Sequence, residues 1–243
     1  MRRSSCRTLQ SYTPPSAVVF DLVGAVLGGS EAVARAWTAA FQTSGIAIDV
    51  EAADDILGLG DAAGAFHMLC LHKPLSGPAP EDVAGVCSAF RRELVRLCRH
   101  RSGALRTPGW MKVTKALAAH DIPVAVATHL DRGTALELVA CCLPALTVPV
   151  VSMTDAEDAQ GTAGPLHAAL RQLGVIGSTS QAVWVSDSPS VLARYPEVRA
   201  WGVDTGWVPA EATERWHRAE GVLEDLDDLL DVLSLRARRV EMD

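Results

Sequence analysis

Three polar side chains stand at the ends of apolar runs that have the composition of buried strands. The runs are SAVVF, IPVAVA and QAVWVS, and they lead to Asp21, Thr128 and Asp187. In parallel α/β sheets the ligand binds beyond the carboxyl ends of the strands, so we expect these three side chains to meet at one site. Two carboxylates there bind a hard divalent cation through oxygen, and the threonine hydroxyl donates to an anion. The pattern indicates a site for an anionic small molecule.

The elements that position these side chains alternate between strands and helices. A helical pattern begins at Ser30, and the residues from about 46 to 105 have helical spacing and no strand. Alternation elsewhere predicts a doubly wound parallel α/β sheet with an inserted all-helical cap. The predicted division is a flexible tail over residues 1–15, an α/β core over 16–30 and 106–243, and the cap over 31–105. We also expect an irregular segment over Thr154–Gly164 and a closing helix over Leu223–Leu233.

Composition excludes several classes of partner. The 243 residues are 49% hydrophobic and carry a net charge of −7, which is globular usage and disfavours nucleic acid as a partner. No apolar stretch reaches the roughly 18–20 residues that span a bilayer, and no apolar region follows the basic start, so we expect neither a membrane segment nor a secretory signal. The six cysteines form no C-x-x-C pair. Reduced thiols and a cytoplasmic location are the expectation.

Three segments together resemble the motifs of the haloacid dehalogenase superfamily. VVFDLVGAVL resembles the first motif, a strand followed by D-x-D-G-T; VAVATHLDR resembles the second, and VWVSDSPS the fourth. The resemblance covers roughly residues 16–235 and implies a Rossmann-like core with a helical cap. It also implies that Asp21 is the nucleophile and that Thr128 binds the transferred phosphoryl group. Mg²⁺ would be bound by Asp21, Asp187 and the backbone carbonyl of Val23.

The first motif departs from the family pattern. Val23 stands where phosphatases of this family have the acid that protonates the leaving group, and its loss is expected to cost roughly 10²–10⁴-fold in rate. Phosphonatases and 2-haloacid dehalogenases lack that acid naturally. The segment FQTSGIAIDVEAADDILGLG resembles the phosphonatase cap, so the chain resembles the phosphonoacetaldehyde hydrolase-like branch. The lysine that forms the Schiff base in that branch falls at Gly60 or Asp61, so an imine is not expected by that route.

Other charged positions of the family are also missing. The cationic residue of the third motif falls at Gln160 or Thr162, and Arg132 is the nearest substitute for it. Ser190 and Val191 replace a second acid of the fourth motif, which predicts weak Mg²⁺ binding or none. His129 either faces the cleft as an acid or base, or lies in a loop exposed to water. The predicted substrate-binding residues are thus Thr128, His129, Arg132, Gln160 and Thr162.

Three functions fit these motifs. The first is a hydrolase of a small phosphorylated, phosphonate or related organic acid, built on Asp21, and the neutral Val23 also suits dehalogenase-type chemistry. The second is a repurposed enzyme that uses the same cleft for a non-hydrolytic step. The third is a non-catalytic binding protein. Caps of phosphonatase relatives often pair, so the resemblance also allows a homodimer.

Overall fold

The computed structural model describes residues 14–72, 77–158, 164–175, 177, 179–206 and 216–235. Its centre is a six-stranded parallel sheet in the order β3-β2-β1-β4-β5-β6. The strands are β1 Val18–Asp21, β2 Val124–Ala127, β3 Val150–Val151, β4 Val183–Ser186, β5 Arg199–Val203 and β6 Gly221–Leu223. The predicted doubly wound sheet is confirmed.

Helices cover both faces of the sheet. The helices of the core are α5 Trp110–Ala119, α6 Arg132–Cys142, α7 Met153–Asp158, α8 Gly164–Gln172, the 3-10 turn η1 Thr179–Gln181, α9 Pro189–Leu192 and α10 Asp228–Val232. Alternate residues of β1 point to opposite faces, so Phe20 packs against Trp110 of α5 while Val19 packs in the cluster formed with α8 and α9. Burial on both faces explains why the strand runs are continuously apolar.

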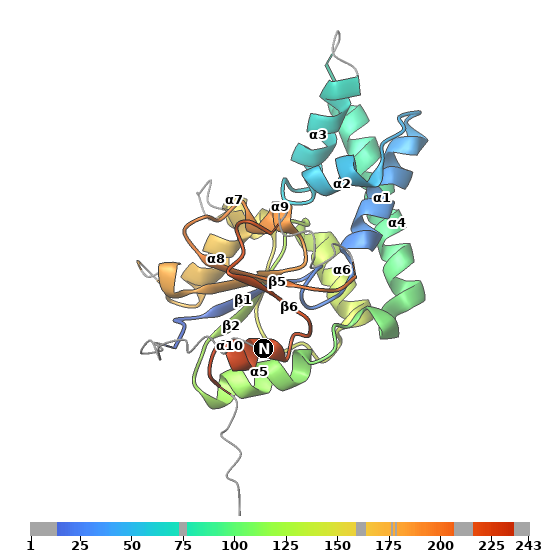
Figure 1. Ribbon diagram of the computed structural model, residues 1–243. Coiled ribbons are helices and arrows are strands. Elements are labelled where there is room, and N and C mark those ends of the chain that lie inside the picture. Colours follow the sequence, from blue (N-terminus) through green and yellow to red (C-terminus); the bar gives the residue numbers. More distant parts are fainter. Residues whose placement is uncertain are drawn as a thin grey trace, which may run out of the picture.

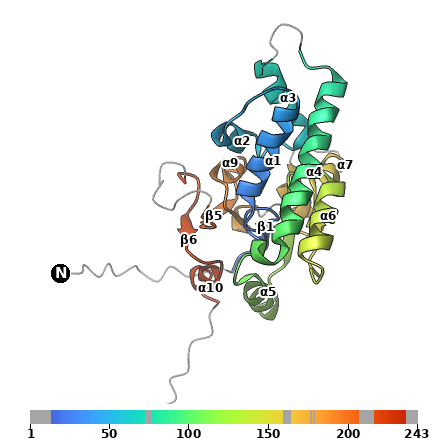
Figure 2. The ribbon, with the colours of Figure 1, turned by 90° about the vertical axis from the view of Figure 1, so that its right-hand side faces the viewer.

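Four helices between β1 and the rest of the sheet form the cap. They are α1 Ser30–Thr43, α2 Val50–Ile56, α3 Asp61–His72 and α4 Pro80–Leu105. Figure 1 shows them gathered at one end of the core, and Figure 2 shows α1 running beside α4. The two helices are joined by the stacked rings of Trp37 and Phe90, whose centroids are 3.9 Å apart. The inserted helical cap is confirmed, and α4 also packs against α6 of the core.

Two predicted elements need correction. Helix α7 occupies part of the segment expected to be irregular, because Ser152 and Asp155 form a capping box: the Asp155 backbone N–H donates to Ser152 Oγ at 3.2 Å, and Asp155 Oδ2 accepts from the Ser152 N–H at 2.8 Å. At the end of the chain, Leu223 closes strand β6, and the helix begins only at Asp228. No helix in the part of the chain that the structure describes is long and apolar enough to span a membrane.

Candidate active site

The nucleophile predicted from the sequence lies at the centre of the sheet. Asp21 ends β1, which pairs with β2 on one side and with β4 on the other. The chain then turns sharply, with the backbone N–H groups of Ala25 and Val26 donating to the Asp21 carbonyl at 3.1 and 3.0 Å. The carboxyl group of Asp21 is 4% exposed and therefore lies in a largely dry environment.

A second carboxylate lies beside it. Burial raises the pKa of Asp21 well above its usual value; the hydrogen bond from Ser186 Oγ at 2.8 Å opposes this shift, and the charge of Asp187 reinforces it. The two carboxylates thus face each other closely enough to interact. Asp187 follows β4, is 1% exposed, and accepts hydrogen bonds from the hydroxyls of Ser30 and Thr205. Ser30 is the first residue of α1, so the start of the cap is bonded directly to the acid pair.

Glycine at position 24 is required by this arrangement. Its φ of +138° is a conformation that side chains rarely adopt, and a Cβ atom there would lie 2.5 Å from Asp187 Oδ1. Substitution Gly24→Ala is expected to cost about 2–3 kcal/mol in free energy of unfolding and to displace Asp187. Gly45→Ala is the matched control, because Gly45 has a positive φ of +72° but open space around the added methyl group. Chemical denaturation of both variants measures the difference, and equal losses would show that the contact with Asp187 costs nothing.

Thr128 and His129 approach the same site from β2. Thr128 is 2% exposed, and its Oγ1 accepts a hydrogen bond from the Leu130 N–H at 3.3 Å. His129 is buried, so the interpretation of it as a solvated loop residue is wrong. Its Nε2 lies 3.0 Å from the hydroxyl of Tyr195, and burial, reinforced by the nearby Arg194, lowers the pKa of His129 to about 3. The imidazole is therefore neutral at physiological pH.

These residues enclose a small cavity under the cap. Asp21, Val23, Thr128 and His129 line it from the core, and Ser30 and Leu57 line it from the cap side. Its volume of about 30 Å³ is room for one or two water molecules. A phosphoryl group is larger than this volume.

The donor set is compatible with a magnesium ion. Within the described ranges, no three acidic, histidine or cysteine side chains gather as a metal site. Magnesium, however, takes only one or two carboxylates from many proteins and completes its shell with water and phosphate oxygens. Asp21 and Asp187 supply two, and the repulsion between them is what a bound cation would relieve. Asp21 and Asp187 therefore fit the ion as its two carboxylate ligands, the described residues add no third one, and binding of the ion by them and by the Val23 carbonyl stays a prediction.

The fold matches solved structures over nearly the whole chain, although no protein-family model and no curated protein matches the sequence. A hydrolase from Pseudomonas syringae superposes with a TM-score of 0.71 at 18% identity, over 91% of this chain and 99% of that one. A phosphonoacetaldehyde hydrolase-like protein from Oleispira antarctica gives 0.70 at 19%, over 94% and 96%. A β-phosphoglucomutase from Clostridium difficile gives 0.70 at 13%, over 88% and 93%. The chain has a haloacid dehalogenase-like fold.

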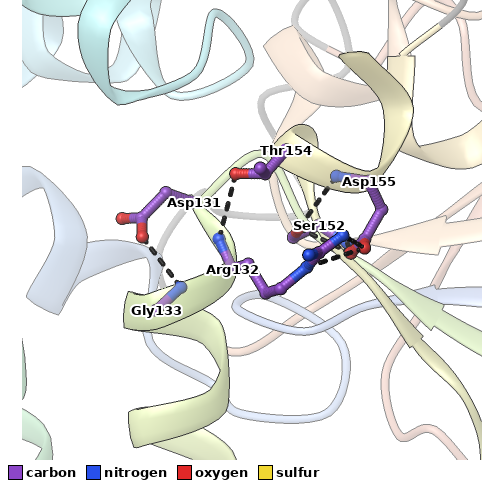
Figure 3. A network of polar contacts seen from close by, with 6 residues as sticks. All are labelled: Asp131, Arg132, Gly133, Ser152, Thr154 and Asp155. Carbon is purple, nitrogen blue, oxygen red and sulfur yellow. Dashed lines mark hydrogen bonds and ion pairs between the residues drawn. The ribbon is translucent and has the colours of Figure 1, made fainter. Parts of the chain in front are cut away.

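Within this haloacid dehalogenase-like fold, Arg132 lies outside the lining of the Asp21 cavity. Its Nε donates to Asp155 Oδ1 at 2.9 Å, and its side chain is 49% exposed. Figure 3 shows Arg132 reaching toward Asp155 and Ser152 while Asp131 leaves the helix start on another side. Substrate binding by Arg132 stays a prediction, and it requires the pair with Asp155 to open. Gln160 and Thr162, the other predicted cation positions, lie outside the described residues.

Replacing Arg132 by alanine separates these roles. An exposed ion pair contributes less than about 1 kcal/mol, so Arg132→Ala is expected to leave the free energy of unfolding almost unchanged. Steady-state kinetics then decide the functional question. A KM raised at least tenfold would place Arg132 on the substrate, and an unchanged KM would restrict it to the surface pair.

Several residues of the site were not predicted from the sequence. Ser30, Ser186 and Thr205 all donate hydrogen bonds to the two carboxylates. Serine and threonine are common in loops, and the partners of Ser30 and Ser186 lie about 160 residues away in the chain, so no local spacing identifies them. The one local signal is the position of Ser186, which immediately precedes Asp187 at the end of β4.

Proposed function

We propose that the chain is a hydrolase of small phosphorylated, phosphonate or related organic acids, with Asp21 as the nucleophile. The observation that supports this most strongly is the meeting of Asp21, Thr128 and Asp187 at the carboxyl ends of three adjacent strands beneath a cap. A buried carboxyl group is costly unless a cation compensates it, and among the described residues Asp21 receives hydrogen bonds only from a hydroxyl and a backbone N–H. A functional role explains why such a group is kept.

The proposed reaction uses these groups in two steps. An oxygen of Asp21 attacks the phosphorus atom, the bond from phosphorus to the leaving group breaks, and the leaving group departs with the electron pair. Water then attacks the phosphorus of the aspartyl phosphate, which releases inorganic phosphate and restores Asp21. Ser186 orients the attacking carboxylate, and the Thr128 hydroxyl donates to a phosphoryl oxygen. Mg²⁺ held by Asp21, Asp187 and the Val23 carbonyl would neutralise charge on the phosphoryl group.

The residue at position 23 restricts the substrates. Valine cannot protonate a leaving group, and His129, whose pKa is about 3, is neutral and carries no extra proton to donate. The leaving group must therefore be stable as an anion when it departs. Weakly basic leaving groups satisfy this, and so does halide, where Asp21 attacks carbon and water hydrolyses the resulting ester.

A small panel of compounds tests the proposal. Aryl and alkyl phosphates, phosphonoacetaldehyde and 2-haloacids are incubated with the protein, with and without Mg²⁺, and released phosphate and halide are measured. We expect product from compounds with weakly basic leaving groups, faster release with Mg²⁺, and no product from an Asp21→Asn variant. Silence across the panel with a folded protein would overturn the proposal and favour the repurposed or non-catalytic functions.

A further inference from the structure

A second cavity lies between the cap and the core, next to the first. Its volume is about 230 Å³, and it shares His129 with the cavity at Asp21. The cap contributes Asp61 and Arg91 to its lining, and the core contributes Asp131 and Thr154. Asp61 is the first residue of α3 and only 7% exposed, which is unusual for an acidic side chain on the surface of a small helical domain.

Asp61 contacts an acid of the core across this boundary. Both acids line the same cavity, and the Nε atom of one arginine, Arg91, lies within 4 Å of a carboxylate oxygen of each. Arg91 of α4 is closer to Asp131 than to Asp61: its Nε is 2.9 Å from Asp131 Oδ2 but 3.8 Å from Asp61 Oδ2. Asp61 Oδ2 is buried and has no hydrogen-bond partner. Arg91 is therefore a cation shared by both acids, and it lies nearer to Asp131 than to Asp61.

Two carboxyl groups in contact need a proton between them, and the surroundings place it on Asp61. Burial is the largest cause that raises the pKa of Asp61, to about 8, and the hydrogen bond and charge of Asp131 add to it. Asp131 is the N-cap of α6, and despite its partial burial the hydroxyl and the N–H of Thr134 and the charge of Arg91 keep its own pKa low. Cys87 also faces the pair, and its thiol is neutral because its pKa is raised to about 11.

The contact falls on the loop that carries the predicted phosphoryl-binding residue. Asp131 comes three residues after Thr128, in the connection from β2 to α6. The neighbouring Gly60 has a φ of +82°, and a Cβ there would lie 3.4 Å from the backbone oxygen of His129. Residues 60 and 61 of the cap thus lie against this loop. They are also the positions at which the phosphonatase resemblance would place a lysine.

We propose that Asp61 is a positioning residue, which docks the cap on the Thr128–Asp131 loop through the cluster that it forms with Asp131 and Arg91. The inference rests on the proposed function for its kinetic consequences, although the docking itself does not. Loss of the proton leaves two facing carboxylates and a single arginine, so docking weakens as pH rises toward and just past 8. Substrate capture depends on cap closure and weakens with it, whereas a chemical step within the closed complex does not involve Asp61.

Two substitutions at this position separate docking from mere structural support. The side-chain amide introduced by Asp61→Asn is neutral, as the protonated acid is, and supplies an N–H donor toward Asp131, but it does not titrate. The variant Asp61→Ala removes the polar group altogether. Asp55→Asn is the matched control, because Asp55 is an exposed acid on the neighbouring helix α2 and its replacement changes the net charge equally.

Hydrogen exchange at pH 7 and pH 9, corrected for intrinsic rates, tests docking without any substrate. We expect exchange in α3 and in the Thr128–Asp131 loop to rise at least tenfold at pH 9 in the parent and in Asp55→Asn. The exchange rate should stay low in Asp61→Asn at both pH values, and it should be high in Asp61→Ala at both pH values. The same pH response in Asp61→Asn as in the parent, or unchanged protection in Asp61→Ala, would overturn the proposal whether or not a substrate is known.

Kinetics supply the second readout once a substrate is found. The parent's KM is expected to rise about tenfold between pH 7 and pH 9, with kcat changed less than twofold, and Asp61→Asn is expected to abolish that rise. A kcat that falls in place of the rise in KM, or a rise in KM that persists in Asp61→Asn, would refute positioning by Asp61. Failure of the proposed function is distinguishable, because it would abolish turnover without changing the exchange pattern.

Discussion

Replacement of Asp21 by asparagine is expected to lower turnover at least about 10³-fold, the scale of loss when a nucleophile is removed. The amide has the shape of the carboxylate, and its oxygen still accepts the hydrogen bond from Ser186, but it is not a nucleophile. The fold should therefore survive while the chemistry is lost. Turnover is measured on whichever panel compound gives product, and circular dichroism and thermal unfolding establish that the variant is folded.

A milder substitution at the same site serves as the control for Asp21→Asn. Ser186→Ala removes one hydrogen bond to Asp21 and leaves the nucleophile in place, so a loss of about tenfold is expected from poorer orientation. A graded pair of effects, large for Asp21 and small for Ser186, is what nucleophilic catalysis requires. Full activity in Asp21→Asn would mean that the reaction uses another group, and the assignment of the cleft would fail.

The fold was predictable because buried strands are recognisable as short apolar runs in the sequence. Runs such as VVF and VWV are apolar at every position since both sheet faces are covered, and a polar residue marks the point where each strand emerges. Asp21, Thr128 and Asp187 were found by that rule. Helix α7 was missed even though Ser152 and Asp155 form a readable capping box, because six residues are too few for a helical period to show.

The contacts between cap and core were not predictable in the same way. The bond between Ser30 and Asp187 joins residues 157 apart, and the pair of Asp61 and Asp131 joins the cap to a loop 70 residues later. Nothing in the local pattern distinguishes Asp61 from other acids at helix starts, where such residues are common for reasons of the helix dipole. Only the packing of α3 on the β2–α6 loop reveals that this acid is buried. The chemical character of the cap therefore follows from tertiary structure.

Burial of Asp61 also predicts a large effect on stability. Its pKa is about 8 in the folded protein and near 3.8 as an isolated side chain, so the folded state holds one proton more than the unfolded state between these values. Stability contributed by this group is therefore fully present below pH 4 and is lost as pH rises toward 8, at up to about 1.4 kcal/mol per pH unit. The cap can also open without the rest of the protein unfolding. In that case the total loss of stability cannot exceed the free energy that docking of the cap contributes.

The variant Asp61→Asn should remove that loss. We expect it to be more stable than the parent at pH 7, and the difference between the two to grow from pH 5 to pH 8 and then to level off. Denaturant unfolding at several pH values measures it, and subtraction of the two curves cancels every other titrating group that the substitution does not touch. Asp55→Asn should run parallel to the parent, since Asp55 is exposed. A difference that is independent of pH would mean that Asp61 is ionised in the folded protein, and the cap would then be docked through Arg91 alone.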